Sequence, residues 1–570
     1  MSDNKVELIT RIATLESEIQ RLKRAKTYGL VWEDKPEDVV VQCKANIPVL
    51  KEVKTRKIVT DESLPTNLLI EGDNYHSLSV LNYTHRGGFD VIYADPPYNT
   101  GNKSWRYNND YIEKDDGFRH SKWISYIEKR LRLSRSLLKD DGVIVVTIDD
   151  YEIGTLRLLL DEIFGEDNRL GLITIMHNPR GRSDDQYFAT SHEYALFYGK
   201  NPDKAITYKL DLTQEQRELF PLTDEFSNYR LLPLKRTGSN STPNERPKLY
   251  YPIFANKKSG EISIKERVGK DWLVIEPKDS TGAKRVWRWG KEKVQREWKT
   301  ELIAKFKNDK CSIFTKDRIK EGRKPKTIWV DPKYDASSHG TVLLENILGE
   351  RKVFDYPKSL YAVIDTLKIL TKEKRDASVL DFFAGSGTTG HAVFELNKQD
   401  GGNRRFVLCT NNENNICEEV THKRLEHVIK GYKDKGGQLV KGLGGDLRYY
   451  KTDLVSTDKL QKISDEARIK VTYQAGEMIA LREDTLTETE KNDWWQIFED
   501  HGRMTAIYFK EDKAKLSELV AKLEQKNIPV ALYIFSWGKN EYRGELGSGT
   551  IRVEDIPEPI LEVYKEINRL

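Results

Sequence analysis

Short apolar runs alternate with longer amphipathic segments between residues 67 and 200. Four runs have the length and the β-branched or aromatic content of buried strands: 67–72, 89–94, 142–148 and 193–199. Between them, the segments 111–139 and 151–164 repeat their apolar residues at helical spacing. Such alternation predicts an α/β fold with a mostly parallel sheet.

The alternation stops near residue 201 and resumes at Tyr356. Residues 201 to about 348 have a mixed pattern, with tryptophans at positions 272, 287, 289, 298 and 329. After Tyr356 the pattern predicts five elements: helix 358–370, strand 378–383, helix 388–396, strand 404–410 and helix 416–432. We therefore expect one sheet made by two halves of the chain, with the irregular block inserted between them.

These changes of pattern divide the chain into five regions: 1–66, 67–200, 201–350, 351–451 and 452–570. The first has a short apolar stripe at a/d spacing on a predicted helix (Leu8, Ile12, Leu15, Ile19 and Leu22). The stripe either packs on its own domain or supports self-association. The last region has a smaller βαβ pattern and is expected to be a separate interaction module: 504–509, 513–525 and 529–537.

Charge is distributed unevenly along the chain. The 570 residues include 94 Lys or Arg and 90 Asp or Glu, a formal net charge of +4. Residues 230–330 alone hold 27 basic and 12 acidic side chains, a local charge of +15, so the rest carries −11. A basic block within a mildly acidic chain indicates a polyanionic partner for that block.

Composition excludes several other classes of protein. A content of 38% hydrophobic and 32% charged residues is typical of a globular chain, and no apolar run reaches the about 18 residues of a membrane span. The first residues lack the basic and apolar regions of a signal peptide. Four scattered cysteines (Cys43, Cys311, Cys409 and Cys417) argue against a metal site or a disulfide framework. We expect a cytoplasmic protein.

A glycine-rich stretch, DFFAGSGTTG, follows a predicted strand and opens a predicted helix. Gly385, Gly387 and Gly390 have the spacing of a dinucleotide-binding loop, in which glycines make a tight turn and let a ligand approach the backbone. The Gly-Lys-Ser/Thr ending of a P-loop is missing. Glu413 follows the next strand, where an acid could bind a ribose diol. The alternative is a plain strand-to-helix turn with a solvated acid.

A second stretch, VIYADPPYNTGN, ends a strong strand with an acid, two prolines and an aromatic residue. At the carboxyl end of a strand Pro96 and Pro97 cost no ladder hydrogen bond, and they leave nearby carbonyls free to accept. Asp95 and such a carbonyl could bind both hydrogens of an exocyclic amino group, which makes its nitrogen nucleophilic. Tyr98 could stack on the ring of an extruded base. A rigid turn alone would explain the prolines but not the acid and the aromatic together.

Together, DPPY and FAGSGTT resemble the amino-group DNA methyltransferases that use S-adenosylmethionine, and their order is similar to that of the β class. Other stretches resemble the Mod subunits of type III restriction–modification systems, among them YGLVWEDKPE, LIEGDNYHSL, SHEYALFYGK and NNENNICEEVTHKRLEHVIKGY. The similarity covers most of residues 1–200 and 350–455. It implies a Rossmann-like methyltransferase sheet, with a catalytic half in 67–200, a target-recognition insert in 201–350 and a cofactor-binding half in 351–451.

The resemblance also implies roles for individual residues. The catalytic residues would be Asp95, Pro96, Pro97 and Tyr98. The cofactor would be held by the glycine loop (Asp381, Phe383, Ala384, Gly385, Gly387, Thr388 and Thr389), with Glu413 on its ribose, Asp73 near its adenine and Lys358 near its methionine carboxylate. Related enzymes often read Lys-Pro before the following helix, whereas this chain reads Tyr356-Pro357-Lys358.

The leading hypothesis is methyl transfer to the 6-amino group of a flipped adenine in double-stranded DNA. An Asp at position 95 resembles the adenine enzymes more than the cytosine-N4 enzymes. A methyltransferase that acts alone or in another defence system stays open. An NAD-dependent dehydrogenase would explain only the glycine spacing, and a non-catalytic DNA-binding protein only the basic insert. The resemblance further implies a homodimer that binds a helicase–nuclease restriction subunit.

Overall fold

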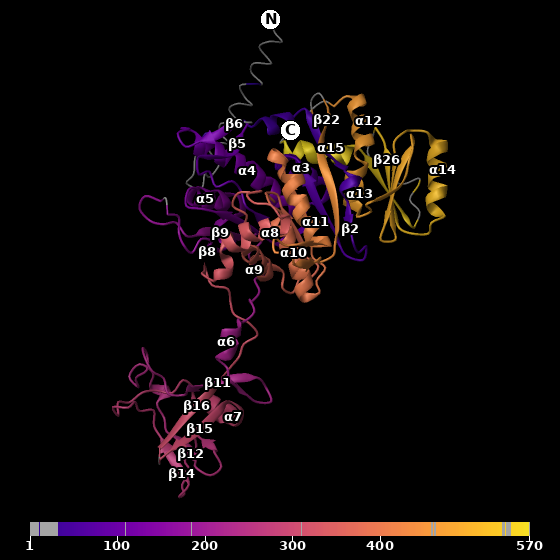
Figure 1. The fold of residues 1–570 in the computed structure, drawn as a ribbon. Helices are drawn as coiled ribbons and strands as arrows, with labels where there is room; N and C mark the ends of the chain where they lie inside the picture. The colour runs from indigo at the N-terminus through magenta and orange to yellow at the C-terminus, as the bar shows by residue number, and fades with distance from the viewer. Residues whose placement is uncertain are drawn as a thin grey trace. The chain divides into compact units, whose positions relative to one another are not determined.

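The structure, a computed structural model, describes residues 32–108, 110–183, 185–308, 310–457, 463–537 and 549–568, with residues 11, 460, 542 and 546. The predicted N-terminal stripe lies outside these residues, at Leu8, Ile12, Leu15, Ile19 and Leu22. The chain forms two compact units, Met1–Tyr208 with Lys326–Leu570 and Lys209–Pro325. Figure 1 colours both units along the chain.

The larger unit is built on an 11-stranded sheet with the order β1-β22-β3-β19-β18-β4-β7-β9-β8-β17, and β2 (Ile58–Val59) pairs with β22. Its six central strands are parallel: β22 (Asp446–Ser456), β3 (Thr66–Glu71), β19 (Arg405–Thr410), β18 (Ser378–Asp381), β4 (Phe89–Ala94) and β7 (Leu138–Ile148). Antiparallel pairs flank them through β1 (Asn46–Glu52) and β9 (Glu193–Gly199), and the far edge holds β8 (Arg169–Ile175) and β17 (Ile328–Trp329). The predicted α/β fold with a mostly parallel sheet is confirmed.

The chain reverses its direction across the sheet between β18 and β4. The connections through α3 (Asn74–Thr84) and α4 (Arg119–Leu137) lead from β3 to β4 and β7, whereas α10 (Thr388–Asp400) leads from β18 to β19 on the other side. Because parallel crossovers are right-handed, the helices of the two halves cover opposite faces of the sheet. In Figure 1, α3, α4 and α5 (Ile153–Phe164) form one group, and α9 (Leu360–Thr371), α10 and α11 (Lys423–Lys430) form the other.

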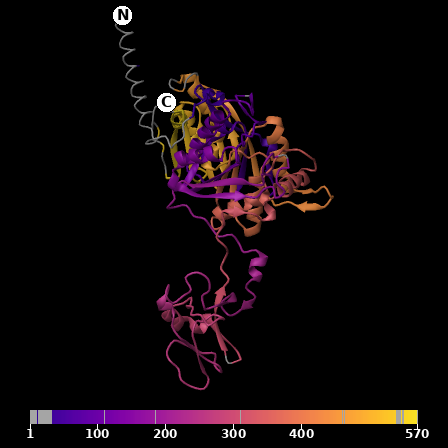
Figure 2. The same ribbon diagram turned by 90° about the vertical axis from the view of Figure 1, so that its left-hand side faces the viewer.

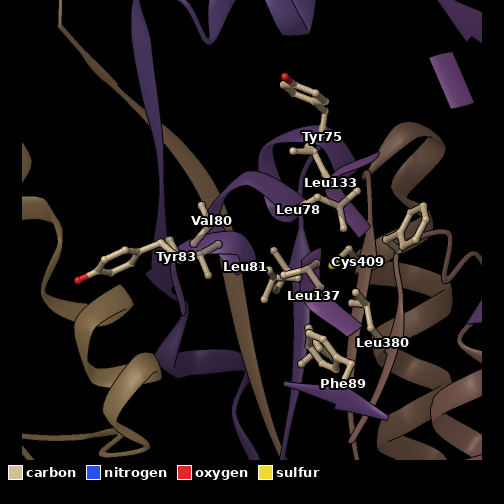
Figure 3. Close-up of a cluster of buried hydrophobic side chains, with 14 of the residues drawn as sticks. Tyr75, Leu78, Val80, Leu81, Tyr83, Phe89, Leu133, Leu137, Leu380 and Cys409 are labelled. Carbon is tan, nitrogen blue, oxygen red and sulfur yellow. The ribbon is translucent and has the colours of Figure 1, made fainter. Parts of the chain in front are cut away.

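The central strands are covered on both faces, which is why they read as nearly continuous apolar runs. Leu69, Ile92 and Leu380, from three of these strands, are 0% exposed. Figure 3 shows one side of this core, where α3 and α4 meet β18 and β19 through the labelled side chains Leu78, Leu81, Leu133, Leu137, Leu380 and Cys409. Apolar packing thus joins the two halves of the chain into one unit.

The predicted bounds of two helices were wrong at one end each. Tyr111 lies in β6 (Asp110–Glu113), which pairs with β5 (Asn102–Tyr107), and α4 begins only at Arg119. The side chain of Asp116 accepts the N–H of Phe118 at 2.8 Å, so a turn with Gly117 separates the hairpin from the helix. Downstream, α11 ends at Lys430, because Gly431 adopts φ 94° and opens β20 (Gly431–Lys433).

The smaller unit, Lys209–Pro325, has two antiparallel sheets, of which one has the order β10-β11-β16-β15 and the other β13-β12-β14. Trp287 is 2% exposed and belongs to its core, and Trp289 and Trp298 pack against that core. This unit spans fewer residues than the insert predicted at 201–350. One reason is that β17, which falls within the predicted insert, pairs with β8 of the large sheet. It contains 28 Lys or Arg and 17 Asp or Glu, a net charge of +11.

The C-terminal region contains the predicted βαβ unit as β25 (Arg503–Tyr508), α14 (Lys513–Glu524) and β26 (Val530–Phe535), within a sheet of five strands. Met478 and Ile560 of this region share a hydrophobic cluster with Leu78 of α3. Figures 1 and 2 show its orange and yellow elements beside the large sheet. The region therefore packs against the core of the larger unit. Among the described residues, no helix has the length and apolar character needed to cross a membrane.

Candidate active site

The two motifs that the sequence predicts to carry the chemistry lie on neighbouring strands. Strands β4 and β18 are parallel, with Val91 opposite Val379 and Ile92 opposite Leu380. Their carboxyl ends therefore meet at one edge of the sheet, where β4 continues into DPPY and β18 into the glycine loop. This edge lies at the point where the chain reverses its direction across the sheet, the place at which open α/β sheets bind their ligands.

Asp95 follows β4 and is held by two neighbours. The hydroxyl Oγ1 of Thr147, on the adjacent strand β7, donates to Asp95 Oδ1 at 2.6 Å. The ammonium Nζ of Lys358 lies 3.1 Å from the same oxygen. Both contacts use Oδ1, and no donor within the described ranges is placed on Oδ2, while the side chain is 24% exposed. One carboxylate oxygen is thus fixed and the other is left to accept a hydrogen bond.

The loop after Asp95 is rigid for reasons beyond its prolines. Trp123 of α4 donates its Nε1–H to the carbonyl of Pro97 at 2.7 Å. Asn99 adopts φ 57°, is 0% exposed and donates to Glu152 Oε1 at 2.5 Å. The expectation that the carbonyls on both sides of Pro96 are free is therefore wrong for Pro97, whose oxygen is occupied. Among the described residues, no donor is placed on the carbonyl of Pro96, which is therefore available to a ligand.

Tyr98 belongs to a buried polar cluster with Glu193 and Lys358. Its hydroxyl donates to Glu193 Oε2 at 3.0 Å, and Lys358 Nζ lies 2.6 Å from the same oxygen. Lys358 also donates to the Tyr98 hydroxyl and lies 4.4 Å from the centroid of its ring. The expected position of Lys358 near the methionine carboxylate of a cofactor stays a prediction, and the structure places its ammonium against Asp95 and Tyr98 of the DPPY motif.

Electrostatics keep this cluster charged. Burial opposes the charge of Lys358, but Asp95 and Glu193 outweigh it and raise the pKa of the ammonium. Burial likewise opposes the charge of Glu193, but Lys358, His177 and the hydroxyl of Tyr98 lower the pKa of its carboxyl. We therefore infer that lysine and glutamate form an ion pair across the neutral range of pH.

The glycine loop has the conformation that its sequence predicts. Gly385 and Gly387 adopt φ +48° and +77°, in the left-handed region that favours glycine. A Cβ on Gly385 would lie 3.1 Å from the ring of Phe354, and one on Gly387 would lie 3.1 Å from Cγ2 of Thr421. The hydroxyl of Thr421 donates to the carbonyl of Gly385 at 2.6 Å, which fixes the turn.

Asp381, Thr388 and Thr389 shape this loop from inside. Asp381 is 2% exposed and accepts the backbone N–H of Phe383 at 2.9 Å and the hydroxyl of Thr389 at 2.6 Å. Burial, with a contribution from Asp95, raises the pKa of the Asp381 carboxyl to about 7. Thr388 accepts a hydrogen bond at 2.8 Å from the buried Arg424. Phe383 and Ala384 line the same turn, with the Phe383 ring 6.2 Å from that of Tyr126.

Two partly exposed acids follow the next strands along the same edge. Glu413 follows β19, its side chain is 41% exposed, and Nη1 of Arg106 lies 3.5 Å from its Oε1. Asp73 follows β3 and caps α3 by accepting the N–H of Tyr75 at 2.7 Å. Arg130 lies 3.3 Å from Asp73 and 2.7 Å from Glu37 of the N-terminal arm. The glycine loop, Glu413 and Asp73 thus follow adjacent strands at one edge of the sheet.

Sequence reasoning missed several residues that complete this site, namely Thr147, Glu193, Trp123, Asn99 and Arg130. A signal existed for two of them, because Thr147 lies within a predicted buried strand and Glu193 opens another, where polar side chains are uncommon. The others have no local pattern that marks them.

Comparison with known proteins agrees with these observations. A family model described as DNA methylase matches residues 89–423. The Mod subunit of the type III restriction-modification enzyme EcoPI of Escherichia phage P1 is 34% identical over 459 residues, which cover 73% of this chain and 70% of that protein. The type II methyltransferase M.KpnI of Klebsiella pneumoniae is 37% identical over 378 residues, 64% of this chain and 88% of that protein. The EcoP15I Mod subunit of Escherichia coli is 28% identical over 504 residues, 74% of this chain and 71% of that protein.

Proposed function

The chain belongs to the DNA methylase family, and from this premise we propose that it transfers a methyl group from S-adenosylmethionine to the 6-amino group of a flipped adenine in double-stranded DNA. The observation that carries the proposal is the pairing of β4 with β18, which brings Asp95 and the Gly385–Gly387 turn to one edge of the sheet. A methyl acceptor and a methyl donor could meet there.

The residues at this edge fit the proposed cofactor. Gly385 and Gly387 adopt positive φ in a turn that follows β18, the arrangement in which dinucleotide-binding loops bring their backbone close to a ligand. Glu413 and Asp73 are partly exposed acids, which can accept hydrogen bonds from a ribose diol and from an adenine amino group. When bound there, S-adenosylmethionine supplies an electrophilic methyl group. The buried side chains of Asp381, Thr388 and Thr389 would hold the turn in shape.

The target base would be held by the DPPY loop. Asp95 Oδ2 and the Pro96 carbonyl can accept the two hydrogens of the exocyclic amino group, which reduces conjugation of the nitrogen lone pair with the ring. Thr147 and Lys358 keep the carboxylate in place through Oδ1. Tyr98 would stack on the base, and Asp95 Oδ2 would accept the proton that the amino group gives up when the methyl group is transferred.

A long-read methylome of a host that expresses the chain tests this proposal. We expect N6-methyladenine at one short sequence motif and none in a host that expresses Asp95→Ala. N4-methylcytosine at such a motif would show that the target base is cytosine and not adenine. Binding of NAD rather than S-adenosylmethionine by the purified chain, measured by calorimetry, would refute the proposal in favour of a dehydrogenase.

The insert, which we place within 201–350, is proposed to recognise the DNA sequence. Its compact unit, Lys209–Pro325, has a net charge of +11, enough to neutralise several phosphates. Exchange of this unit for that of a related chain should change the methylated motif. A chimaera that remains active on the original motif would contradict this role.

We further propose that the chain is the modification subunit of a type III system, active in the cytoplasm as a homodimer and in complex with a helicase–nuclease. Its similarity to two Mod subunits supports this assignment. Co-expression with a candidate restriction subunit and copurification of a stable complex is the direct test. A host in which the methyltransferase acts with no such subunit encoded nearby would favour an independent enzyme.

A further inference from the structure

The loop between β8 and β9 begins and ends beside the DPPY motif. Both β7 and β8 run antiparallel to β9, so the carboxyl end of β8 points to the same edge of the sheet as Asp95. At the far end of the loop, Glu193 opens β9 and accepts the hydrogen bond of Tyr98 at 3.0 Å. The loop therefore projects from the catalytic edge of the larger unit.

The stem of this loop is ordered by its own hydrogen bonds. Asn178 donates its N–H to the carbonyl of Ser191 at 3.1 Å, and Arg182 donates to that of Thr190 at 3.0 Å. Thr190 in turn donates to Asp185 Oδ2 at 2.7 Å. These bonds join the two sides of the loop and hold its tip in a defined place.

Two adjacent aromatic residues form the tip. Tyr187 is 82% exposed and Phe188 is 89% exposed. Side chains of this size contribute little to folding when they are so exposed, and neighbouring pairs of them on a surface are typical of binding sites. Neither residue is buried in the core of the larger unit, so packing does not explain why the loop has two aromatic side chains here.

Two arginines lie in the stem of this loop. Burial raises the pKa of Asp149 and lowers that of His177, and the guanidinium of Arg182 acts on both groups. Arg180 is exposed two residues earlier in the same stem. The loop holds two arginines in its stem and two aspartates, at positions 184 and 185, before its aromatic tip. Exposed aromatic rings with arginines beside them fit a nucleic acid, whose bases stack on aromatic rings and whose phosphates bind arginine.

We propose that residues 177–183 and 185–192 form a DNA-inserting loop, in which Tyr187 and Phe188 stack against the bases exposed when the target base leaves the duplex. Arg180 and Arg182 bind the phosphates on either side. This inference rests on the base flipping of the proposed function. It assigns to the catalytic unit a contact with DNA that does not depend on the insert.

The test compares the parent with Tyr187→Ala/Phe188→Ala on two duplexes that contain the recognised sequence. One duplex is fully paired, and the other has an abasic site opposite the target adenine, which makes flipping easier. We expect the variant to lose about tenfold or more in kcat/KM on the paired duplex and to regain most of it on the abasic one. Trp537→Ala, at another exposed aromatic residue (43%), is the matched control.

Phe188→Trp should keep the parent rate on both duplexes, because it retains a stacking surface. Calorimetry of S-adenosylmethionine binding checks that each variant is folded. The inserting role would be overturned if the double alanine variant kept the parent rate on the paired duplex, or if it lost the same factor on both duplexes. In both cases the parent would still methylate DNA, so the proposed function would stand. A parent that methylates neither duplex would instead refute the proposed function.

Discussion

Lys358 Nζ lies 3.1 Å from Oδ1 of Asp95, although the two residues belong to different halves of the chain. The same ammonium lies 4.4 Å from the centroid of the Tyr98 ring and 2.6 Å from Glu193 Oε2. Lysine therefore contacts both groups that we assign to the target base. A group in this position can orient the carboxylate and balance the charges of two neighbouring acids.

Lys358→Met should lower kcat about tenfold or more and leave the affinity for S-adenosylmethionine within a factor of about three. Lys358 lowers the pKa of the Glu193 carboxyl, so without the cation this carboxyl should bind a proton at higher pH and the acidic limb of the rate profile should move to higher pH. Lys333→Met, which removes another paired lysine of the same unit, is the control. A large loss of cofactor affinity with an unchanged kcat would show that Lys358 binds the cofactor and does not position Asp95.

Asp95→Ala should abolish methyl transfer and leave cofactor binding nearly unchanged. The carboxylate is assigned to the target amine, so its loss removes about 3 kcal/mol or more of transition-state stabilisation. Transfer of tritiated methyl groups to DNA measures the rate, and calorimetry measures the cofactor affinity. Activity above a few per cent of the parent rate would exclude the assigned role.

Gly385→Val and Gly387→Val should each destroy cofactor binding. Both positions have positive φ, and a side chain would meet Phe354 or Thr421 at 3.1 Å. Gly401→Val is the matched control, because its φ is +68° at the end of α10 and nothing lies within 4 Å of its Cβ position. Normal calorimetric affinity for S-adenosylmethionine in both loop variants would show that the cofactor binds elsewhere.

Asp381→Asn should change the dependence of stability on pH. Burial raises the pKa of Asp381 from 3.8 to about 7, so the folded chain retains a proton that the unfolded chain has released between these values. This group thus destabilises the fold as pH rises through the window, and the asparagine variant should gain stability relative to the parent. The gain has a slope of at most about 1.4 kcal/mol per pH unit.

Urea denaturation between pH 4 and pH 7.5 measures this effect, with the exposed Asp203→Asn as control. A difference in the free energy of unfolding that stays constant across the window would contradict it.

The purified chain should scatter light as a particle of about twice 66.1 kDa if it forms the proposed homodimer. Substitution of lysine for Ile12 and Ile19 should produce monomers if the apolar stripe at the N-terminus forms the interface. Fully active monomers of the parent at micromolar concentration would count against the homodimer.

Much of the larger unit could be predicted from the sequence, because its central strands and helices have clear apolar periods. The glycine loop was also predictable, since the spacing of Gly385 and Gly387 after a strand indicates a turn with positive φ. Predictions failed at the ends of helices: Tyr111 pairs with Arg106 in the hairpin of β5 and β6, and before Tyr432 the helix ends at Gly431, whose φ is 94°. The apolar period of a helix is set by many residues, whereas the position of its end depends on only a few. Helix ends are therefore harder to predict from the sequence than helices.

The sequence by itself determined the elements, the two motifs and the basic block, because each depends on residues close together in the chain. Only the tertiary structure decided that β18 lies between β19 and β4, which brings Asp95 beside the glycine loop. It also decided that Lys358 and Glu193 join Asp95 and Tyr98. These pairings connect distant segments: Tyr98 and Glu193 are 95 residues apart in the chain, and Tyr98 and Lys358 are 260 residues apart. They depend on the joint burial of strands from both halves, which no local period encodes.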